Sequence, residues 1–230
     1  MNISPQATLP SSGAFFASSW SGGKDGCFAR WVSSQSGAKP ACLLTMLKEG
    51  EQRTSAHGLH QDVLQAQADC LGTPIIFGSA GFGGYEQGLK KALATAIDEY
   101  SVSHLAFGDI DLDAHKDWYD RILEETAIQT CYPLWHYDRK QLLKDMFSAG
   151  QETMIVSVKN ESLDQSFLGQ ILTPSLADEI EAKGICPTGE EGDFHSLVIN
   201  GPDFKQPLSV KKADIWQDDW GHSVLELSPA

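Results

Sequence analysis

The sequence predicts an α/β protein: a doubly wound parallel sheet followed by a smaller α+β domain. Two observations support this prediction. Short runs that are apolar on both faces alternate, through the first 160 residues, with longer stretches whose apolar residues recur at helical spacing. After that point a loop rich in Gly and Glu leads into an apolar strand without further repeats. We therefore expect a first domain over residues 13–160 and a second over residues 161–230.

The expected strands of the sheet are short and mostly apolar: 14–20, 41–47, 74–78, 105–110, 130–134 and 153–158. The helices expected between them are 59–71, 85–100, 118–127 and 139–149, where residues such as Leu89, Leu93 and Ala96 lie on one face. In the second domain we expect helices at 162–168 and 175–183 and a strand at 194–199. Ligands of doubly wound sheets bind beyond the carboxyl ends of the strands, so the loops there are the candidate sites.

The loop after the first strand is the most informative, and it reads Ser21, Gly22, Gly23, Lys24, Asp25 and Gly26. Adjacent glycines let a backbone approach a phosphate closely, and the N-terminus of the following helix offers unpaired N–H groups. The loop is no G-x-x-x-x-G-K-[ST] motif, because no Ser or Thr follows Lys24. The alternative is a Gly-Gly turn carrying a Lys-Asp pair on the surface.

Composition disfavours several classes of function. A formal net charge of −14 disfavours a nucleic-acid partner, which would need a basic face. The five cysteines are scattered and form no C-x-x-C pair, which is typical of reduced thiols and disfavours a structural zinc site. No apolar run approaches the roughly 20 residues that span a bilayer. We expect a cytoplasmic protein that does not act at a membrane.

A second candidate site precedes the last apolar strand, where Glu190, Glu191 and Asp193 lie among glycines. Carboxylates on such a permissive backbone could bind Mg²⁺ or orient ammonia, and His195 beside them could carry a proton. The alternatives are an acidic, solvated turn and a histidine packed in its strand.

The first loop resembles the S-G-G-x-D-S signature of the PP-loop ATP pyrophosphatases, with Gly26 where those proteins usually carry serine. Further segments follow in a fixed order: Gly108, Asp109 and Ile110, then 115–121, 132–135, 189–195 and 200–202. Together they resemble the diphthine–ammonia ligase family of PP-loop proteins, over nearly the whole chain from about residue 15 to residue 204.

This resemblance implies a Rossmann-like nucleotide-binding domain followed by a family-specific domain, with the active site in the cleft between them. Characterised relatives use ATP to adenylate the carboxylate of diphthine, a modified histidine of translation elongation factor 2, and release pyrophosphate. Ammonia then displaces AMP and leaves an amide. The implied cofactors are ATP and Mg²⁺. The acceptor carboxylate is left open, on a protein or on a small metabolite, and so is a homodimer.

The resemblance also implies roles for individual residues. The residues that map onto the pyrophosphate-binding and nucleotide site are Ser21, Gly22, Gly23, Lys24, Asp25, Gly26, His57, Gly108 and Asp109. The implied catalytic residues are Lys24, Asp25, Glu190, Glu191 and Asp193, and Asp25 is the candidate metal ligand. Asp25 could instead cap its helix, and Arg121, a weaker candidate, could pair with Asp117 one turn back.

Two other functions stay open at this stage. The first is a PP-loop enzyme that modifies tRNA, which the acidic charge and the absence of cysteine pairs disfavour. The second is a nucleotide-binding module without catalysis, in which Gly26 marks a weakened pyrophosphatase. The loop at 78–84, rich in glycine, could cover the adenine or act as a lid in either case.

Overall fold

The computed structural model describes residues 3–55, 57–81 and 83–230, so Ala56 and Phe82, which fall in two of the candidate loops, lie outside the described residues. The chain forms two compact units. The first contains residues 1–21, 25–52 and 72–137, and the second contains 22–24, 53–71 and 138–230. The last segment of the second unit begins at residue 138, whereas the predicted domain boundary lies between residues 160 and 161.

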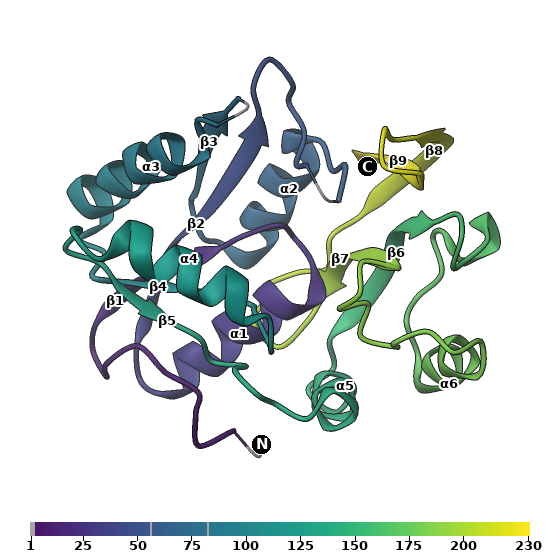
Figure 1. Cartoon of the computed structure of the whole chain (residues 1–230), viewed down its shortest axis with the longest axis horizontal. Coiled ribbons are helices and arrows are strands. Elements are labelled where there is room, and N and C mark those ends of the chain that lie inside the picture. Colours follow the sequence, from purple (N-terminus) through teal and green to yellow (C-terminus); the bar gives the residue numbers. More distant parts are fainter. Residues whose placement is uncertain (1–2, 56, 82) are drawn as a thin grey trace. The chain divides into compact units, whose positions relative to one another are not determined.

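The first unit is built on a parallel sheet (Figure 1). Its strands are β1 (Phe15–Ser19), β2 (Lys39–Lys48), β3 (Ile75–Ala80), β4 (His104–Ala106) and β5 (Gln129–Cys131). They lie in the order β3-β2-β1-β4-β5, and each neighbouring pair is parallel. Because the strand order reverses at β1, the sheet is doubly wound, and the predicted fold class is confirmed.

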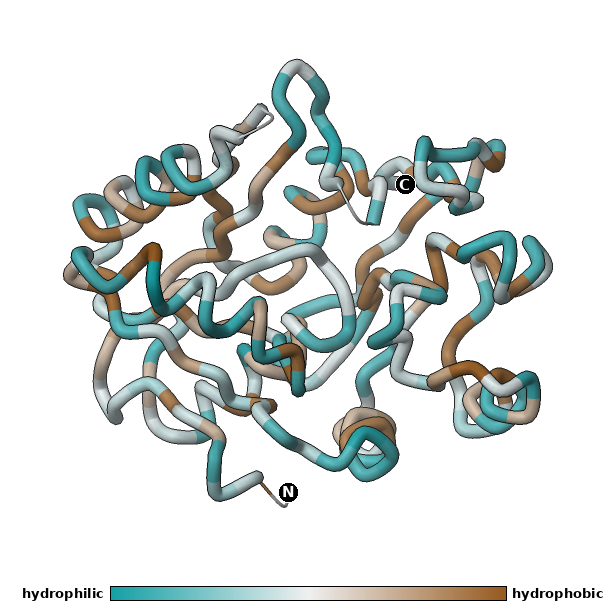
Figure 2. The backbone as a smooth tube through the Cα atoms, in the orientation of Figure 1, coloured by the Kyte–Doolittle hydropathy of each residue, from teal (hydrophilic) through white to brown (hydrophobic). Residues whose placement is uncertain are grey.

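Buried clusters cover both faces of this sheet. Helices α3 (Tyr85–Tyr100) and α4 (Asp113–Leu123) pack on the face that bears Ala17 and Leu105. Phe16 precedes Ala17 and Ala106 follows Leu105, so their side chains lie on the opposite face of the sheet. There they belong to a separate buried cluster. Brown and teal segments alternate along α3 in Figure 2, as expected for a helix with one buried face. The expectation of strands covered on both faces is therefore confirmed.

The segments that carry the family resemblance in this unit form a structural network. Asp120 of α4 accepts hydrogen bonds from the hydroxyls of Thr130, at 2.6 Å, and Tyr132, at 2.8 Å, and pairs with Lys116 at 2.6 Å. Burial by itself raises the pKa of Asp120, but these three partners bring it below its ordinary value. The Lys116 ammonium also lies 5.0 Å from the centre of the Tyr132 ring.

The second unit is built on an antiparallel sheet in the order β7-β6-β9-β8. Its strands are β6 (Glu152–Lys159), β7 (Phe194–Asn200), β8 (Val210–Gln217) and β9 (His222–Pro229). Residues 153–158 therefore do not form a sixth strand of the parallel sheet, and that expectation is wrong. Antiparallel pairing with β7 and β9 places them in the other sheet, a choice that an apolar run alone does not reveal.

The helices of the second unit are α2 (Gln61–Leu71), α5 (Arg139–Ser148) and α6 (Pro174–Ala182). Side chains fix where two of them begin: Asp138 accepts from the Gln141 N–H, and Thr173, followed by Pro174, accepts from the Leu176 N–H. The helix expected at 162–168 is only a short 3₁₀ turn, η1 (Gln165–Phe167). No described helix is long and apolar enough to cross a bilayer.

One close backbone contact positions the candidate loop in the first unit. Gly108 follows β4, and a Cβ placed on it would lie 2.7 Å from the Gly26 nitrogen and 2.8 Å from the Asp25 carbonyl carbon. Both are backbone atoms of α1 (Lys24–Gln35), so neither can turn aside. The chain beyond β4 thus passes directly against the start of α1.

We expect Gly108→Ala to lower the free energy of unfolding by about 1–3 kcal/mol, because the added methyl group must displace backbone. Urea titration followed by circular dichroism measures it. Gly84→Ala is the matched control, because its Cβ would be no closer than 3.6 Å to its neighbours. Equal midpoints for the two variants would contradict the close approach.

Candidate functional site

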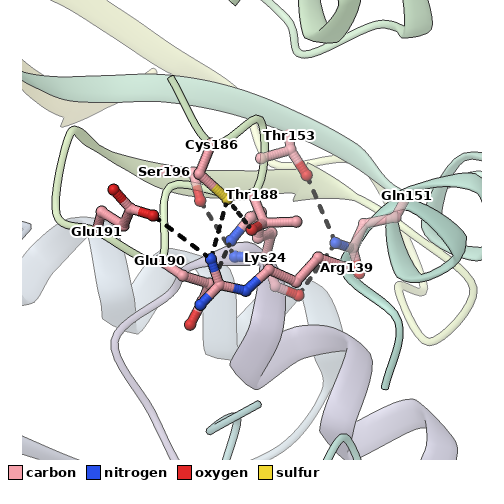
Figure 3. Close-up of polar contacts among 9 residues, drawn as sticks. All are labelled: Lys24, Arg139, Gln151, Thr153, Cys186, Thr188, Glu190, Glu191 and Ser196. Atoms are coloured by element: carbon pink, nitrogen blue, oxygen red, sulfur yellow. Dashed lines mark hydrogen bonds and ion pairs between the residues drawn. The ribbon is translucent and has the colours of Figure 1, made fainter. Parts of the chain in front are cut away.

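Lys24 is the centre of the candidate site in the second unit. It is the first residue of α1, and its side chain is only 5% exposed. Its Nζ lies 3.6 Å from Oε1 of Glu190, and its backbone N–H donates to Oγ of Ser196 at 3.2 Å. Figure 3 shows Lys24 among the residues of the loop that precedes β7. The two motifs that the sequence singled out separately, the Ser21 loop and the acidic loop, thus meet in one ion pair.

The glycines of the Ser21 loop are required by packing within this unit. Gly22 has a φ of +82°, and a Cβ on it would lie 2.8 Å from Cδ2 of Leu64. A Cβ on Gly23 would lie 2.6 Å from Cε1 of His57. The structure shows that these glycines make room for side chains of the protein. That they also let the backbone approach a phosphate stays a prediction.

Hydrogen bonds attach residues 22–24 to β7 and β6. The Gly22 carbonyl accepts from the Val198 N–H at 2.9 Å and from Nε2 of Gln67 at 3.0 Å. The Lys24 carbonyl accepts from Nε2 of Gln151 at 3.1 Å. The loop is therefore held along its backbone.

The sequence interpretation missed three residues of this attachment: Gln67, Gln151 and Ser196. A signal for Gln67 was present, because it lies on the apolar face of α2 with Val63, Leu64, Ala68 and Leu71. A buried polar residue in such a face requires a partner. For Gln151 and Ser196 the sequence offers no comparable signal, because their partners are distant in the chain.

The acidic candidates occupy different positions. The Glu190 side chain is 20% exposed and faces Lys24, whereas that of Glu191 is 70% exposed and lies 3.9 Å from the Arg139 guanidinium. Asp193 accepts a hydrogen bond from the Ser162 hydroxyl, and its carbonyl accepts from the Lys159 N–H. The structure thus brings one of the three carboxylates to Lys24 and places the other two against separate partners.

Arg139, Cys186 and Thr188 form a polar cluster next to the acidic residues of this loop. Nη1 of Arg139 donates to Sγ of Cys186 at 3.3 Å, and Sγ lies 3.0 Å from the Thr188 hydroxyl (Figure 3). Burial by itself raises the pKa of the Cys186 thiol, but hydrogen bonds with Thr188, Arg139 and the Glu190 backbone bring it below its ordinary value.

Two histidines beside Lys24 are held neutral. The His57 ring packs against the His195 ring, tilted by 33° with centres 4.7 Å apart, and His57 Nδ1 donates to the Ser196 carbonyl at 2.9 Å. Burial lowers the pKa of His57 to about 4; the hydrogen bond opposes this shift and the Lys24 charge adds to it. Burial also lowers the pKa of His195 to about 2, with His57, His222 and Lys24 adding to the shift. Both rings are therefore neutral at neutral pH, next to the Lys24–Glu190 ion pair.

The remaining predicted site residues belong to the first unit. Ser21 follows β1, and Asp25 lies in the first turn of α1, where a carboxylate also complements the helix dipole. Asp109 lies 3.2 Å from Nδ1 of His115. Gly26 has more room than its neighbours, because its Cβ would lie 3.3 Å from the Ser19 carbonyl oxygen.

Arg121, the weaker candidate, is exposed near the end of α4. Arg53 supports the loop of His57, because it donates to the Gly58 carbonyl at 3.0 Å and to Glu226 at 2.8 Å. Gly78 is part of β3 and not of a loop.

Comparison with known protein families covers both units. Residues 16–130 match the family model described as diphthamide synthase N-terminal domain. Residues 138–228 match the model described as diphthamide synthase C-terminal domain. The junction between the two models coincides with the segment where the chain passes into α5.

Individual relatives carry the name diphthine–ammonia ligase. The human protein is 22% identical over 167 residues, which cover 71% of this chain and 58% of the human one. The Schizosaccharomyces pombe protein is 22% identical over 223 residues, 87% of this chain and 37% of its own length. The Bos taurus protein is 23% identical over 131 residues, 55% of this chain and 49% of its own length. The chain thus spans roughly a third to three fifths of these relatives.

The neutral histidines predict that stability falls in acid. Both folded pKa values lie below the ordinary 6.5, so the unfolded chain takes up protons first as the pH falls. The stability is complete above about pH 6.5 and is lost as the pH falls from there, to about pH 4 for His57 and to about pH 2 for His195. Between pH 7.5 and pH 5 we expect each histidine to lower the free energy of unfolding by about 2 kcal/mol. Urea unfolding at the two pH values measures this loss.

His57→Asn is the variant that tests this, because asparagine keeps a donor for the Ser196 carbonyl and does not titrate. In this variant the free energy of unfolding should fall by about 2 kcal/mol less than in the wild type between pH 7.5 and pH 5. His136→Asn, at an exposed site whose φ of +53° suits asparagine, should keep the wild-type dependence. An unchanged pH dependence in His57→Asn would refute the assignment.

Proposed function

Because the chain belongs to the diphthamide synthase family, we propose that it is an ATP-dependent ligase that joins ammonia to a carboxylate and releases AMP and pyrophosphate. The observation that carries the proposal is the Lys24–Glu190 pair, which joins the pyrophosphatase-like loop to the acidic loop. The names of the relatives support an amide-forming ligase. The acceptor carboxylate, on a protein or on a small metabolite, is not specified by these residues.

The chemistry needs activation, because a carboxylate is a poor electrophile. Its attack on the α-phosphate of ATP gives an acyl adenylate and pyrophosphate, and ammonia then displaces AMP to form the amide. In this scheme Lys24 stabilises the negative charge that develops on the departing pyrophosphate. Glu190 accepts a proton from the attacking nitrogen, since it is the carboxylate nearest to Lys24 among the three acidic candidates.

The residues present fit a magnesium ion that arrives with the nucleotide. Among the described residues, no group of three or more His, Cys, Asp or Glu side chains could hold a metal ion. Mg²⁺ commonly uses one or two carboxylates together with phosphate oxygens and water, so Asp25 would suffice as its protein ligand. The ion would neutralise charge on the phosphates when bound.

The first test of the proposal uses Lys24→Ala. The protein is incubated with ATP, Mg²⁺ and ammonium, with and without a filtered cell extract, and the nucleotide products are resolved. We expect AMP and pyrophosphate that depend on the extract, and a loss of about 10²–10³-fold in Lys24→Ala. Lys144→Ala, on the exposed side of α5, is the control and should keep the wild-type rate.

ADP as the product, or a full rate in Lys24→Ala, would overturn the proposal. Binding of ATP without any turnover would instead favour a nucleotide-binding module, the alternative that Gly26 suggests.

The second test compares the neighbouring glutamates. Glu190→Gln should lower the rate of amide formation by about 10²-fold, because the amide cannot accept the proton. Glu191→Gln should keep the wild-type rate, because that carboxylate is exposed and faces Arg139. Release of AMP by hydroxylamine, a nucleophile that needs less assistance, should be less affected in Glu190→Gln. Equal losses in both variants would exclude the specific role of Glu190.

A further inference from the structure

We propose that Gln67 is a positioning residue of this enzyme: its buried amide fixes the backbone of residues 22–24 and thereby the place of the Lys24 ammonium. This inference rests on the proposed function, in which Lys24 acts on the pyrophosphate. Gln67 lies on α2, far from Lys24 in the sequence, and it belongs to none of the segments that carry the family resemblance.

The geometry uses both hydrogens of the Gln67 amide. Nε2 donates to the Gly22 carbonyl at 3.0 Å and to the Val198 carbonyl at 2.7 Å. Val198 in turn donates its N–H to the Gly22 carbonyl at 2.9 Å. One side chain therefore joins α2, the loop and β7 at a single point, and it is completely buried there.

Only an amide fits this position well. A buried side chain without donors would leave the Val198 carbonyl and one bond to Gly22 unmet, and a carboxylate would place negative charge between two carbonyl oxygens. The neighbours of Gln67 on the helix face, Leu64 and Ala68, are apolar and offer no substitute. A glutamine in this face costs stability unless both donors are used, which they are.

The attachment controls Lys24 because the loop is short. Gly22 precedes Lys24 by two residues, and the Lys24 N–H and carbonyl are themselves held by Ser196 and Gln151. If the hydrogen bond from Gln67 to the Gly22 carbonyl is lost, the loop shifts at that end while its contacts with Val198, Ser196 and Gln151 remain. A displacement of about 1 Å at a catalytic group can cost about 10²-fold in rate, without any change in the groups that touch the substrate.

The experiment uses Gln67→Met, which keeps the length of the side chain and removes the donors. Two quantities are measured: kcat and KM for ATP in the production of AMP, and hydrogen exchange of the backbone amides in the peptide that covers residues 20–26. We expect kcat to fall by about 10²-fold with a smaller change in KM, and exchange in this peptide to become faster.

Ile180→Ala is the control for lost stability, because Ile180 is fully buried in α6, an element that supplies none of the hydrogen bonds described above for residues 22–24. It should unfold at lower urea concentration than the wild type but keep kcat and slow exchange at residues 20–26. If Gln67→Met does not fold, Gln67→Glu gives a second test. Its carboxyl group can donate one hydrogen bond when protonated, so its kcat relative to the wild type should rise as the pH is lowered from about 8 to about 6.

Wild-type kcat and wild-type exchange in Gln67→Met would overturn the inference. The exchange measurement separates this outcome from a failure of the proposed function. A wild-type protein that makes no AMP contradicts the ligase, whereas the exchange of residues 20–26 still reports whether Gln67 holds the loop.

Discussion

The backbone attachment of residues 22–24 to β7 is the constraint on which the rest of the site depends. Once the Gly22 carbonyl and the Lys24 N–H are bonded to Val198 and Ser196, the loop lies too close to α2 and His57 for any Cβ at its two glycines. The Lys24 side chain is then buried, and a buried ammonium requires a compensating charge, which Glu190 supplies. Loop shape, glycine usage and the ion pair thus follow from one strand contact.

The same burial explains why the nearby histidines do not add to the positive charge. His57 and His195 are packed against each other close to a lysine, and protonation of either would place a second cation in a poorly solvated region. The Lys24 ammonium thus faces the Glu190 carboxylate at 3.6 Å beside two neutral rings.

The sequence predicted the parallel sheet because strands buried on both faces and helices such as α3 leave clear periodic patterns. It did not predict the partner of β6, since an apolar run does not reveal which sheet it joins. It identified Lys24 and Glu190 by residue type, but their contact depends on folding across more than 160 residues. Ser196 was missed because a hydrogen bond to a backbone amide leaves almost no trace in the chemistry of the sequence, whereas Gln67 left one signal, a polar residue on the apolar face of α2.

Gly26 differs from the two glycines before it in the room it leaves for a side chain. Gly22 and Gly23 are enclosed by Leu64 and His57, so a side chain at either position would require the surrounding structure to be rebuilt. Gly26 faces only the Ser19 carbonyl at 3.3 Å, a distance that a shift of a few tenths of an ångström would relieve. A side chain at Gly26, where the PP-loop signature carries serine, would therefore need much less rearrangement than one at either of the two glycines before it.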